Sequence, residues 1–323
     1  MTNPVNDGNH SPIKPLPHRR SQNKSRTKKM NHFLFLLGGV TFVFIFIVGT
    51  YYQVLPWNMY AHGTNTLDNL ALKLGLQKHV YAVVIDAGST GSRVLAFTFH
   101  KSLIDGNLKL DSELFVQVKP GLSSFADNPK EGGQQMLNLL ERAKDVVPPE
   151  QRGSTPLAMK ATAGLRLLPR DKADMLIEEA REVFRESPFH TTEHTVSIMD
   201  GTDEGLFSWF TVNFLQDRFG DGPEETVAAL DLGGGSTQVT FALGEEGEAA
   251  IRAHDPESVH EIQAFHHKLS VYTHSYLGLG LMAGRQAILT AGQPENVTAV
   301  HSPCVNPIIN TTWEYAGINY NVM

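Results

Sequence analysis

The chain has 323 residues, of which 41% are hydrophobic, and a formal net charge of −7 at pH 7. This length and composition are typical of a globular protein with two lobes of ordinary size, and they exclude a disordered chain. The first 32 residues contain seven lysines or arginines and one acid, a charge of +6, so the remaining residues sum to −13 within the total of −7. An acidic body argues against nucleic acid as a partner, because phosphate backbones are bound by clustered lysine and arginine.

An apolar stretch without charge follows this basic tail. Residues 33–52 supply 20 such residues, which is the length that spans the core of a bilayer. Lys24, Arg26, Lys28 and Lys29 precede the stretch, and the positive-inside rule keeps this flank cytoplasmic. A cleaved signal peptide is the alternative, but its apolar region usually has about 7 to 15 residues. The length therefore favours a membrane anchor of type II topology.

This topology predicts the following division of the chain and its location. We expect a basic cytoplasmic tail at 1–32, a transmembrane anchor at 33–52, a lumenal stalk at 53–79, lobe I at 80–195 and lobe II at 196–323. The location would be the Golgi or the endoplasmic reticulum, and release by proteolysis in the stalk stays open. The sequons at Asn296 and Asn310 are consistent with a lumenal body, where they would accept glycans. The single cysteine, Cys304, is unusual for an oxidising compartment and suggests a partner outside this sequence.

Strands and helices alternate from Val80 onward, which predicts an α/β architecture. Period-2 patterns and β-branched residues predict strands at 81–86, 94–99, 157–164 (running into a turn), 195–200, 225–231 and 238–243. Helical patterns cover 132–147, 171–186, 204–219 and 279–289.

Two segments of the chain resemble each other. VVIDAGSTGSRV and AALDLGGGSTQV share a strand, an aspartate, a glycine two residues later and small polar residues before the next strand. The spacing from Asp86 to Val94 equals that from Asp231 to Val239. Two such strand-turn-strand units predict a duplicated fold with two facing lobes.

The turns in these two units have the composition of phosphate-binding loops. Closely spaced backbone N–H groups and hydroxyls bind a polyanionic phosphate chain, and glycine lets the backbone approach it. The turns supply Ser89, Thr90, Gly91, Ser92 and Arg93 in the first unit, and Gly233, Gly234, Gly235, Ser236 and Thr237 in the second. Asp86 and Asp231 precede them, where carboxylates would hold Mg²⁺ or Ca²⁺ through coordinated water. Ordinary hairpin turns are the alternative for one loop, but the pair favours phosphate binding.

Hydrolysis of a phosphate also requires a base that orients and deprotonates the attacking water. Glu204 is the candidate, because it follows a strand and begins a helix in MDGTDEGLFSWF. An acid that complements a helix N-terminus is the alternative reading, and Asp203 suits that role equally well. The local sequence does not choose between base and cap for Glu204.

Four segments resemble ordered signature regions of the nucleoside triphosphate diphosphohydrolase (apyrase) family. They are VVIDAGSTGSRV, KATAGLRLLP, MDGTDEGLFSWFTVNFL and ALDLGGGSTQVTF, in the order and spacing of that family. The resemblance implies a two-lobed fold like that of actin, the sugar kinases and the chaperone ATPases, with mixed sheets in both lobes and the nucleotide between them. The STGSR turn and YTHSYLGLGLMAGRQAIL are most similar to the soluble or Golgi branch, which prefers diphosphates.

The resemblance also implies roles for individual residues. Glu204 would be the catalytic base, and Ser236 and Gln238 would position the water. Asp86, Asp231 and Thr162 would hold the hydrated Mg²⁺ or Ca²⁺. The phosphate contacts would be Ser89, Thr90, Gly91, Ser92, Gly233, Gly234 and Gly235, whereas Arg93 and Arg166 would balance charge.

The function expected from this resemblance is hydrolysis of the terminal phosphate of GDP, UDP or IDP, and also of triphosphates, by direct attack of water in the secretory lumen. Family members continue beyond Met323 with a fifth signature and further cysteines, so the sequence suggests a fragment or an incomplete second lobe. The alternatives are a non-catalytic, membrane-tethered relative and a kinase or polyphosphatase of the same superfamily. The sequence indicates no protein partner.

Overall fold

The computed structural model describes residue 48 and residues 66–104, 106–219, 222–264, 267–294 and 296–323. The chain divides into two units, Met1–Lys73 and Leu74–Met323. In the first unit, residues 66–73 are helical. The membrane span expected at 33–52 lies outside the described residues except for Val48, and none of the helices that are described combines the length and the apolar character that a bilayer crossing requires.

The second unit begins with a five-stranded mixed sheet in the order β3-β2-β1-β4-β5. These strands are β1 (Val80–Ala87), β2 (Ser92–Lys101), β3 (Leu108–Val118), β4 (Leu157–Ala161) and β5 (Val196–Ile198). β1, β2 and β3 pair antiparallel, whereas β4 joins β1 and β5 joins β4 in parallel. Helical crossovers precede β4 and β5, as parallel pairing requires.

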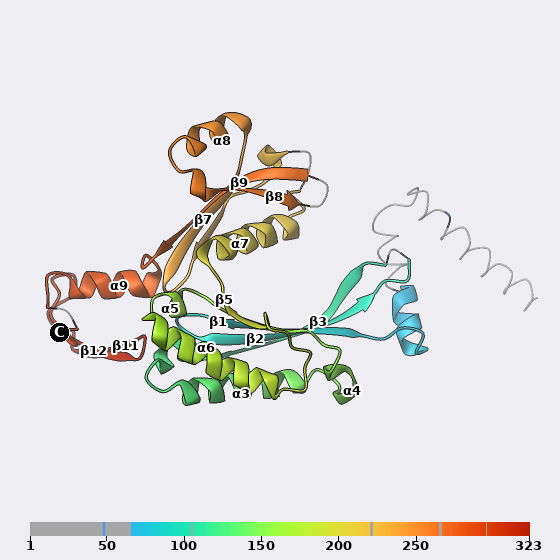
Figure 1. Cartoon of the computed structure of the whole chain (residues 1–323), viewed down its shortest axis with the longest axis horizontal. Helices are drawn as coiled ribbons and strands as arrows, with labels where there is room; N and C mark the ends of the chain where they lie inside the picture. The colour runs from blue at the N-terminus through green and yellow to red at the C-terminus, as the bar shows by residue number, and fades with distance from the viewer. Residues whose placement is uncertain (1–47, 49–65, 105, 220–221, 265–266, 295) are drawn as a thin grey trace, which may run out of the picture. The chain divides into compact units, whose positions relative to one another are not determined.

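One face of this sheet carries the main hydrophobic core. α3 (Pro129–Lys144) and α6 (Arg170–Arg185) lie side by side along that face (Figure 1). Ile85 and Met159 of the sheet pack there with Leu140 and Leu176 of the helices, and all four are buried. Short helical segments connect these elements, namely η1 (Leu122–Phe125), α4 (Pro149–Arg152) and α5 (Ala163–Arg166). Because strand residues alternate between faces, the opposite face of β1 and β4 presents Asp86 and Lys160.

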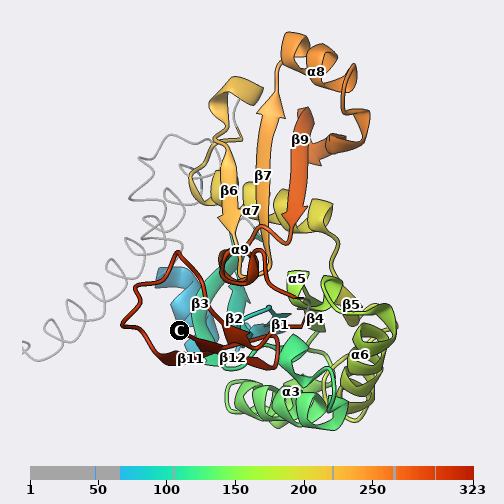
Figure 2. The same cartoon turned by 90° about the vertical axis from the view of Figure 1, so that its left-hand side faces the viewer.

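A second sheet is antiparallel, in the order β6-β7-β9-β8. Its strands are β6 (Ala229–Leu232), β7 (Ser236–Leu243), β8 (Val259–Ala264) and β9 (His267–Leu277). α7 (Gly201–Leu215) covers one face, where Trp209 is fully buried against Val271 (Figure 2). The connections contain η2 (Pro223–Glu225), α8 (Glu245–Arg252) and η3 (Pro256–Ser258).

The C-terminal elements form a small third sheet against a helix. α9 (Leu281–Thr290) is followed by β10 (Ala299–Val300), β11 (Thr311–Tyr315) and β12 (Ile318–Val322), which pair in the order β10-β12-β11. Leu289 of α9 packs with Val300 and Tyr320 in a separate core cluster.

The expected internal similarity is confirmed by the pairing of the strands. Asp86 faces Arg93 across β1 and β2, and Asp231 faces Gln238 across β6 and β7. The backbone N–H of Gly88 donates to the carbonyl of Gly91 at 3.1 Å, and that of Gly233 donates to the carbonyl of Ser236 at 3.0 Å. Both turns are therefore closed by the same hydrogen bond at the same position after the aspartate.

Two expectations about the fold require correction, and some elements were not predicted. β5 pairs with β4 in the first sheet, so that sheet ends after Ile198 rather than at residue 195. Mixed sheets were expected in both lobes, but only the first sheet is mixed, since the second is antiparallel. In the first sheet β4 pairs with β1, whereas no described strand pairs with the corresponding edge of β6 in the second sheet. Several elements were not anticipated, namely β3, β8, β9, α8 and the third sheet.

Candidate active site

The two glycine-rich turns face each other in direct contact. A Cβ atom placed on Gly234 would overlap the hydroxyl of Ser89 and would lie 2.6 Å from the Cγ2 methyl of Thr90. A further glycine from another part of the chain packs against the backbone of each turn. A Cβ on Gly121 would lie 2.5 Å from the Gly88 carbonyl oxygen, and a Cβ on Gly280 would lie 2.5 Å from the Ser236 nitrogen. The close approach of the loops thus requires residues without side chains.

A pocket of about 390 Å³ lies at this junction. It contains most of the side chains and glycines that the sequence singles out for phosphate, metal and base roles. The anticipated residues that line it are Asp86, Ser89, Thr90, Thr162, Glu204, Asp231, Gly233, Gly234, Gly235 and Ser236. Lys160 and Met199 also line it, and sequence reasoning missed both.

Three anticipated residues do not line the pocket. Gly91 closes the first turn through its carbonyl, and a Cβ there would lie 2.8 Å from the Val118 carbonyl oxygen of β3. Ser92 is fully buried, because it lies on the same side of β2 as Val94 in the core. Gly91 and Ser92 therefore lie outside the lining of the pocket, and their phosphate contacts stay predictions. Gln238 is buried behind Ser236 and Glu204.

Glu204 does not cap its helix. The side chain of Asp200 is the N-cap of α7, since its Oδ1 accepts from the Asp203 backbone N–H at 2.8 Å. The carboxylate of Glu204 is 17% exposed and turns toward the pocket instead. Arg166 Nη2 donates to its Oε2 at 2.5 Å, and Gln238 Nε2 donates to the same oxygen at 3.1 Å. Asp200 supplies the N-cap hydrogen bond, whereas Asp203 and Glu204 are the acidic residues of the first turn, where a negative charge complements the helix N-terminus.

Gln238 connects the residues around Glu204. Its Nε2 also lies 2.7 Å from Ser236 Oγ and 2.9 Å from Ser275 Oγ, and Arg166 donates to Ser236 Oγ at 3.2 Å. The Oε1 of Gln238 is buried and has no hydrogen-bond partner among the described residues. Such an atom is suited to accept a hydrogen bond from a bound water. Ser275 was missed in the sequence, because only the β7 and β9 register places it opposite Gln238.

The charges of the pocket perturb one another. Burial raises the pKa of Glu204, the Arg166 guanidinium opposes this shift, and Asp231 and Asp86 add to it. Burial also raises the pKa of Asp231, with a further increase from the negative charge of Asp86. Arg93 lowers the pKa of Asp231, and its Nη1 lies 2.5 Å from Asp86 Oδ2. Three carboxylates share this pocket, and Asp231 lacks an ion pair among the described residues.

The residues present fit a hydrated divalent cation. Asp86 and Asp231 are close enough for one negative charge to disfavour the other, and a cation between them would relieve that repulsion. In the part of the chain that the structure describes, no three or more His, Cys, Asp or Glu side chains converge on a point that could hold a metal ion. Such a cation would therefore take most of its ligands from water and phosphate, as Mg²⁺ often does.

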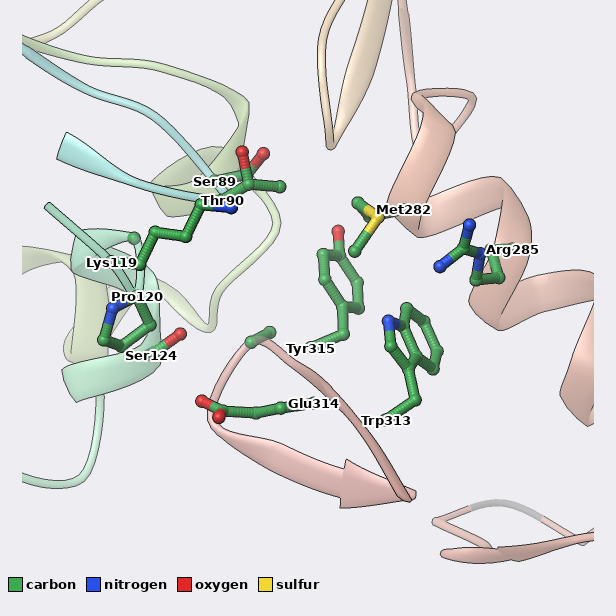
Figure 3. A pocket seen from close by; sticks show the side chains of 12 residues that line it. Ser89, Thr90, Lys119, Pro120, Ser124, Met282, Arg285, Trp313, Glu314 and Tyr315 are labelled. Atoms are coloured by element: carbon green, nitrogen blue, oxygen red, sulfur yellow. The ribbon is translucent and has the colours of Figure 1, made fainter. Parts of the chain in front are cut away.

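A second pocket of about 540 Å³ adjoins the first and shares Ser89 and Thr90 with it (Figure 3). Met282 and Arg285 of α9 and Trp313 of β11 form its far wall. The guanidinium carbon of Arg285 lies 5.6 Å from the centre of the Trp313 ring. The indole Nε1 of Trp313 is buried without a hydrogen-bond partner among the described residues. This pocket offers an aromatic surface and hydrogen-bond donors next to the first glycine-rich loop.

Comparison with known proteins identifies the class of protein that carries this fold and these two loops. The chain belongs to the GDA1/CD39 (nucleoside phosphatase) family, whose pattern matches residues 73–323. This confirms the apyrase resemblance.

Individual relatives are similar over the same region. The chain is 42% identical over 246 residues to ectonucleoside triphosphate diphosphohydrolase 5 of Bos taurus, covering 75% of this chain and 56% of that protein. It is 42% identical over 243 residues to nucleoside diphosphate phosphatase ENTPD5 of Homo sapiens, again covering 75% and 56%. Ectonucleoside triphosphate diphosphohydrolase 6 of Mus musculus is 43% identical, with coverage of 75% and 53%. The chain thus spans about half the length of the curated relatives it matches.

The α/β fold is confirmed by one solved structure, that of nucleoside triphosphate hydrolases from Neospora caninum. It has a TM-score of 0.50 and 18% sequence identity, and the match covers 77% of this chain and 54% of that chain.

Proposed function

We propose that this chain carries the catalytic pocket of a nucleoside diphosphatase that removes the terminal phosphate of GDP, UDP or IDP and also accepts triphosphates. The observation that carries the proposal is the convergence of two glycine-rich loops and Glu204 on one pocket. The family and the name of the human relative support a phosphatase acting on nucleoside diphosphates. We also propose that the chain belongs to the superfamily of actin and the sugar kinases, because its two sheets repeat one strand-turn-strand unit.

In the proposed reaction, water attacks the terminal phosphorus directly, and no covalent enzyme intermediate forms. Glu204 accepts a proton from the water while the new P–O bond forms and the bond to the leaving phosphate oxygen breaks. Ser236 Oγ would hold the water against Glu204, and Gln238, whose Nε2 donates to Ser236 Oγ and Glu204 Oε2, would position both groups. Arg166 keeps the Glu204 carboxylate oriented and favours its ionised form against burial.

The loops and the acidic side chains would bind the diphosphate. Backbone N–H groups of Gly234 and Gly235 and the hydroxyls of Ser89 and Thr90 would contact the phosphate oxygens from two sides, whereas the N–H of Gly233 closes the turn. Asp86, Asp231 and Thr162 would hold Mg²⁺ or Ca²⁺ through water. When bound, this cation would neutralise charge that develops on the phosphate oxygens.

The second pocket supports a nucleotide rather than a polyphosphate as substrate. Its shared residues, Ser89 and Thr90, place it one phosphate loop away from the hydrolytic pocket. The aromatic side chains of Trp313 and Tyr315 line this pocket, and the guanidinium of Arg285, which lies over the Trp313 ring, would contact the base. A polyphosphate has no base that could contact an aromatic side chain next to the first loop.

We further propose that the body lies in the lumen of the Golgi or the endoplasmic reticulum, with residues 33–52 as anchor. The sequence pattern of residues 1–52 supports this proposal, since the basic flank precedes the uncharged stretch. Asn296 and Asn310 are exposed, which is compatible with glycans at both sequons.

The function is tested by phosphate release with Glu204→Gln and the matched control Asp203→Asn. Asp203 is the exposed neighbour in the same helical turn, so both variants remove one charge from the start of α7. With GDP and Mg²⁺ we expect Glu204→Gln to lower kcat about 10²- to 10⁴-fold, the usual range for loss of a general base, and Asp203→Asn to keep it.

Three results would contradict the proposal. Equal turnover in both variants would remove Glu204 from the base role. Binding of GDP without phosphate release by the wild type would indicate the non-catalytic relative, and faster release from tripolyphosphate than from GDP would indicate a polyphosphatase.

A further inference from the structure

A row of polar side chains crosses the first sheet at the edge of the hydrolytic pocket. The strand register places Gln117, Arg93, Asp86, Lys160 and Ser197 side by side on β3, β2, β1, β4 and β5. Their neighbours along the strands, such as Met159 and Ala161 on either side of Lys160, are buried in the core against α3 and α6. Because strand residues alternate, the row belongs to the opposite face of the sheet.

Lys160 differs from the other cations of the pocket in its contacts. Arg93 is paired with Asp86, and Arg166 is paired with Glu204. The Nζ of Lys160 donates instead to the neutral Ser197 Oγ at 2.7 Å. Lys160 has no ion pair with any acid among the described residues, although it lines the same pocket as Asp86, Glu204 and Asp231. Its charge is therefore available to an anion that enters the pocket.

We propose that Lys160 is a phosphate-binding residue of this pocket, contacting the terminal phosphate group of the substrate and the orthophosphate product. The inference rests on the proposed phosphatase function. An ammonium group has three N–H donors, and the contact with Ser197 uses one of them. The other two can reach non-bridging phosphate oxygens, and such charge-assisted hydrogen bonds are among the stronger ones in proteins.

Ser197 is a positioning residue in this arrangement. It lies opposite Lys160 on the edge strand β5, so its hydroxyl holds the ammonium at the end of a flexible four-carbon chain. Neither residue belongs to the glycine-rich loops. A sequence pattern alone therefore gives no reason to connect them with phosphate.

Binding of inorganic phosphate to the whole chain, measured by titration calorimetry in excess Mg²⁺, tests this role without turnover. We expect Lys160→Met to weaken orthophosphate binding about tenfold to hundredfold, as for loss of a hydrogen bond between charged groups, and to raise KM for GDP in the same direction. Lys160→Arg keeps the charge and should retain most of the affinity. Ser197→Ala should weaken binding only a few-fold.

Lys172→Met is the matched control, because Lys172 pairs with Asp127 on the helical side of the sheet. It should leave the orthophosphate affinity unchanged. A Lys160→Met variant that binds orthophosphate as the wild type does, but binds Mg²⁺ more tightly, would overturn the inference and make Lys160 a charge balance for the aspartates.

Failure of the inference and failure of the proposed function give different results. If the wild type hydrolyses GDP and Lys160→Met leaves orthophosphate binding and KM unchanged, only the inference is wrong. If the wild type releases no phosphate from GDP but binds orthophosphate in a Lys160-dependent way, the hydrolytic function is wrong and the phosphate contact stands.

Discussion

The first and second glycine-rich loops are closed by the same backbone hydrogen bond, but they differ in the residue that lies opposite the aspartate on the neighbouring strand. Asp86 faces Arg93 and forms an ion pair with it, whereas Asp231 faces Gln238, which is neutral. Gln238 turns toward Glu204 and Ser236 instead. The pKa of Asp231 is raised by burial and by Asp86, so its charge is less well compensated.

This difference separates the roles that the proposed function gives to the two loops. Both loops would bind the phosphate chain, and Asp86 and Asp231 would share the cation. Only the second loop also connects, through Gln238, to the candidate base on α7. The same strand-turn-strand unit would therefore bind phosphate in both halves and position the attacking water in one.

The largest expected effect comes from pushing the two loops apart. In Gly234→Ala the new methyl group would meet Ser89 and the Thr90 methyl group, 2.6 Å away in the present arrangement. We expect kcat/KM for GDP to fall about 10²-fold, because misplacement of reacting groups by about 1 Å has effects of this size. Gly244→Ala is the control, since nothing lies within 4 Å of a Cβ there, and it should retain activity. Similar activity in both variants would show that the loops need not touch.

Replacing the two aspartates by asparagine should have a smaller effect, and the change in Tm should have opposite signs at the two positions. In EDTA at pH 7, Asp86→Asn should lower Tm by about 2 to 4 °C, because it removes a half-buried ion pair with Arg93 worth about 1 kcal/mol. Asp231→Asn should raise Tm, because the folded-state pKa of Asp231 is raised and its ionised form therefore opposes folding at neutral pH.

That gain should disappear as the pH falls below the ordinary range of an aspartate, where the wild-type Asp231 is protonated in both states. Thermal unfolding of the three proteins across this pH range measures the comparison. A fall in Tm for both variants at pH 7 would mean that the two aspartates are equivalent.

The smallest expected effect is a shift of the pH at which kcat for GDP hydrolysis begins to fall on the acid side, that is, of the acid limb of the pH profile. Glu204 must be ionised to act as base, and its pKa is raised, so kcat should begin to fall at a pH above the ordinary range of a glutamate. Arg166 lowers the pKa of Glu204, so Arg166→Met should move this limb to still higher pH. The pH dependence of GDP hydrolysis at constant ionic strength measures it. A limb that moves to lower pH would contradict the assigned contact.

Much of the fold could be predicted from local patterns. The alternation around β1, β2, β6 and β7 and the amphipathic pattern of α6 identify these elements to within a few residues. β3 was missed because it is an edge strand in which the exposed polar residues Asp111, Ser112 and Glu113 interrupt the alternation of apolar and polar residues. The three short strands of the third sheet have too few residues to show a period.

The pocket residues could be predicted where a contiguous motif marks them, as in the two loops and around Glu204. The burial of Gly91 and Ser92, which keeps them out of the pocket lining, depends on three-dimensional packing that the sequence does not show. Lys160 and Ser275 were missed because strand register brings them to the site. The N-cap of α7 was not predicted, because Asp200, Asp203 and Glu204 all suit a helix start, and only the contacts show that Asp200 supplies the capping hydrogen bond.

The central claim is that both loops bind one phosphate chain. A crystal structure of the chain with Mg²⁺ and a GDP analogue whose bridging oxygen is replaced by methylene tests it most directly. The account predicts a terminal phosphate within hydrogen-bond distance of both Thr90 and Gly234, with a water between its phosphorus and Glu204. A diphosphate that contacts only one loop, with Asp86 and Asp231 facing no common ligand, would contradict it.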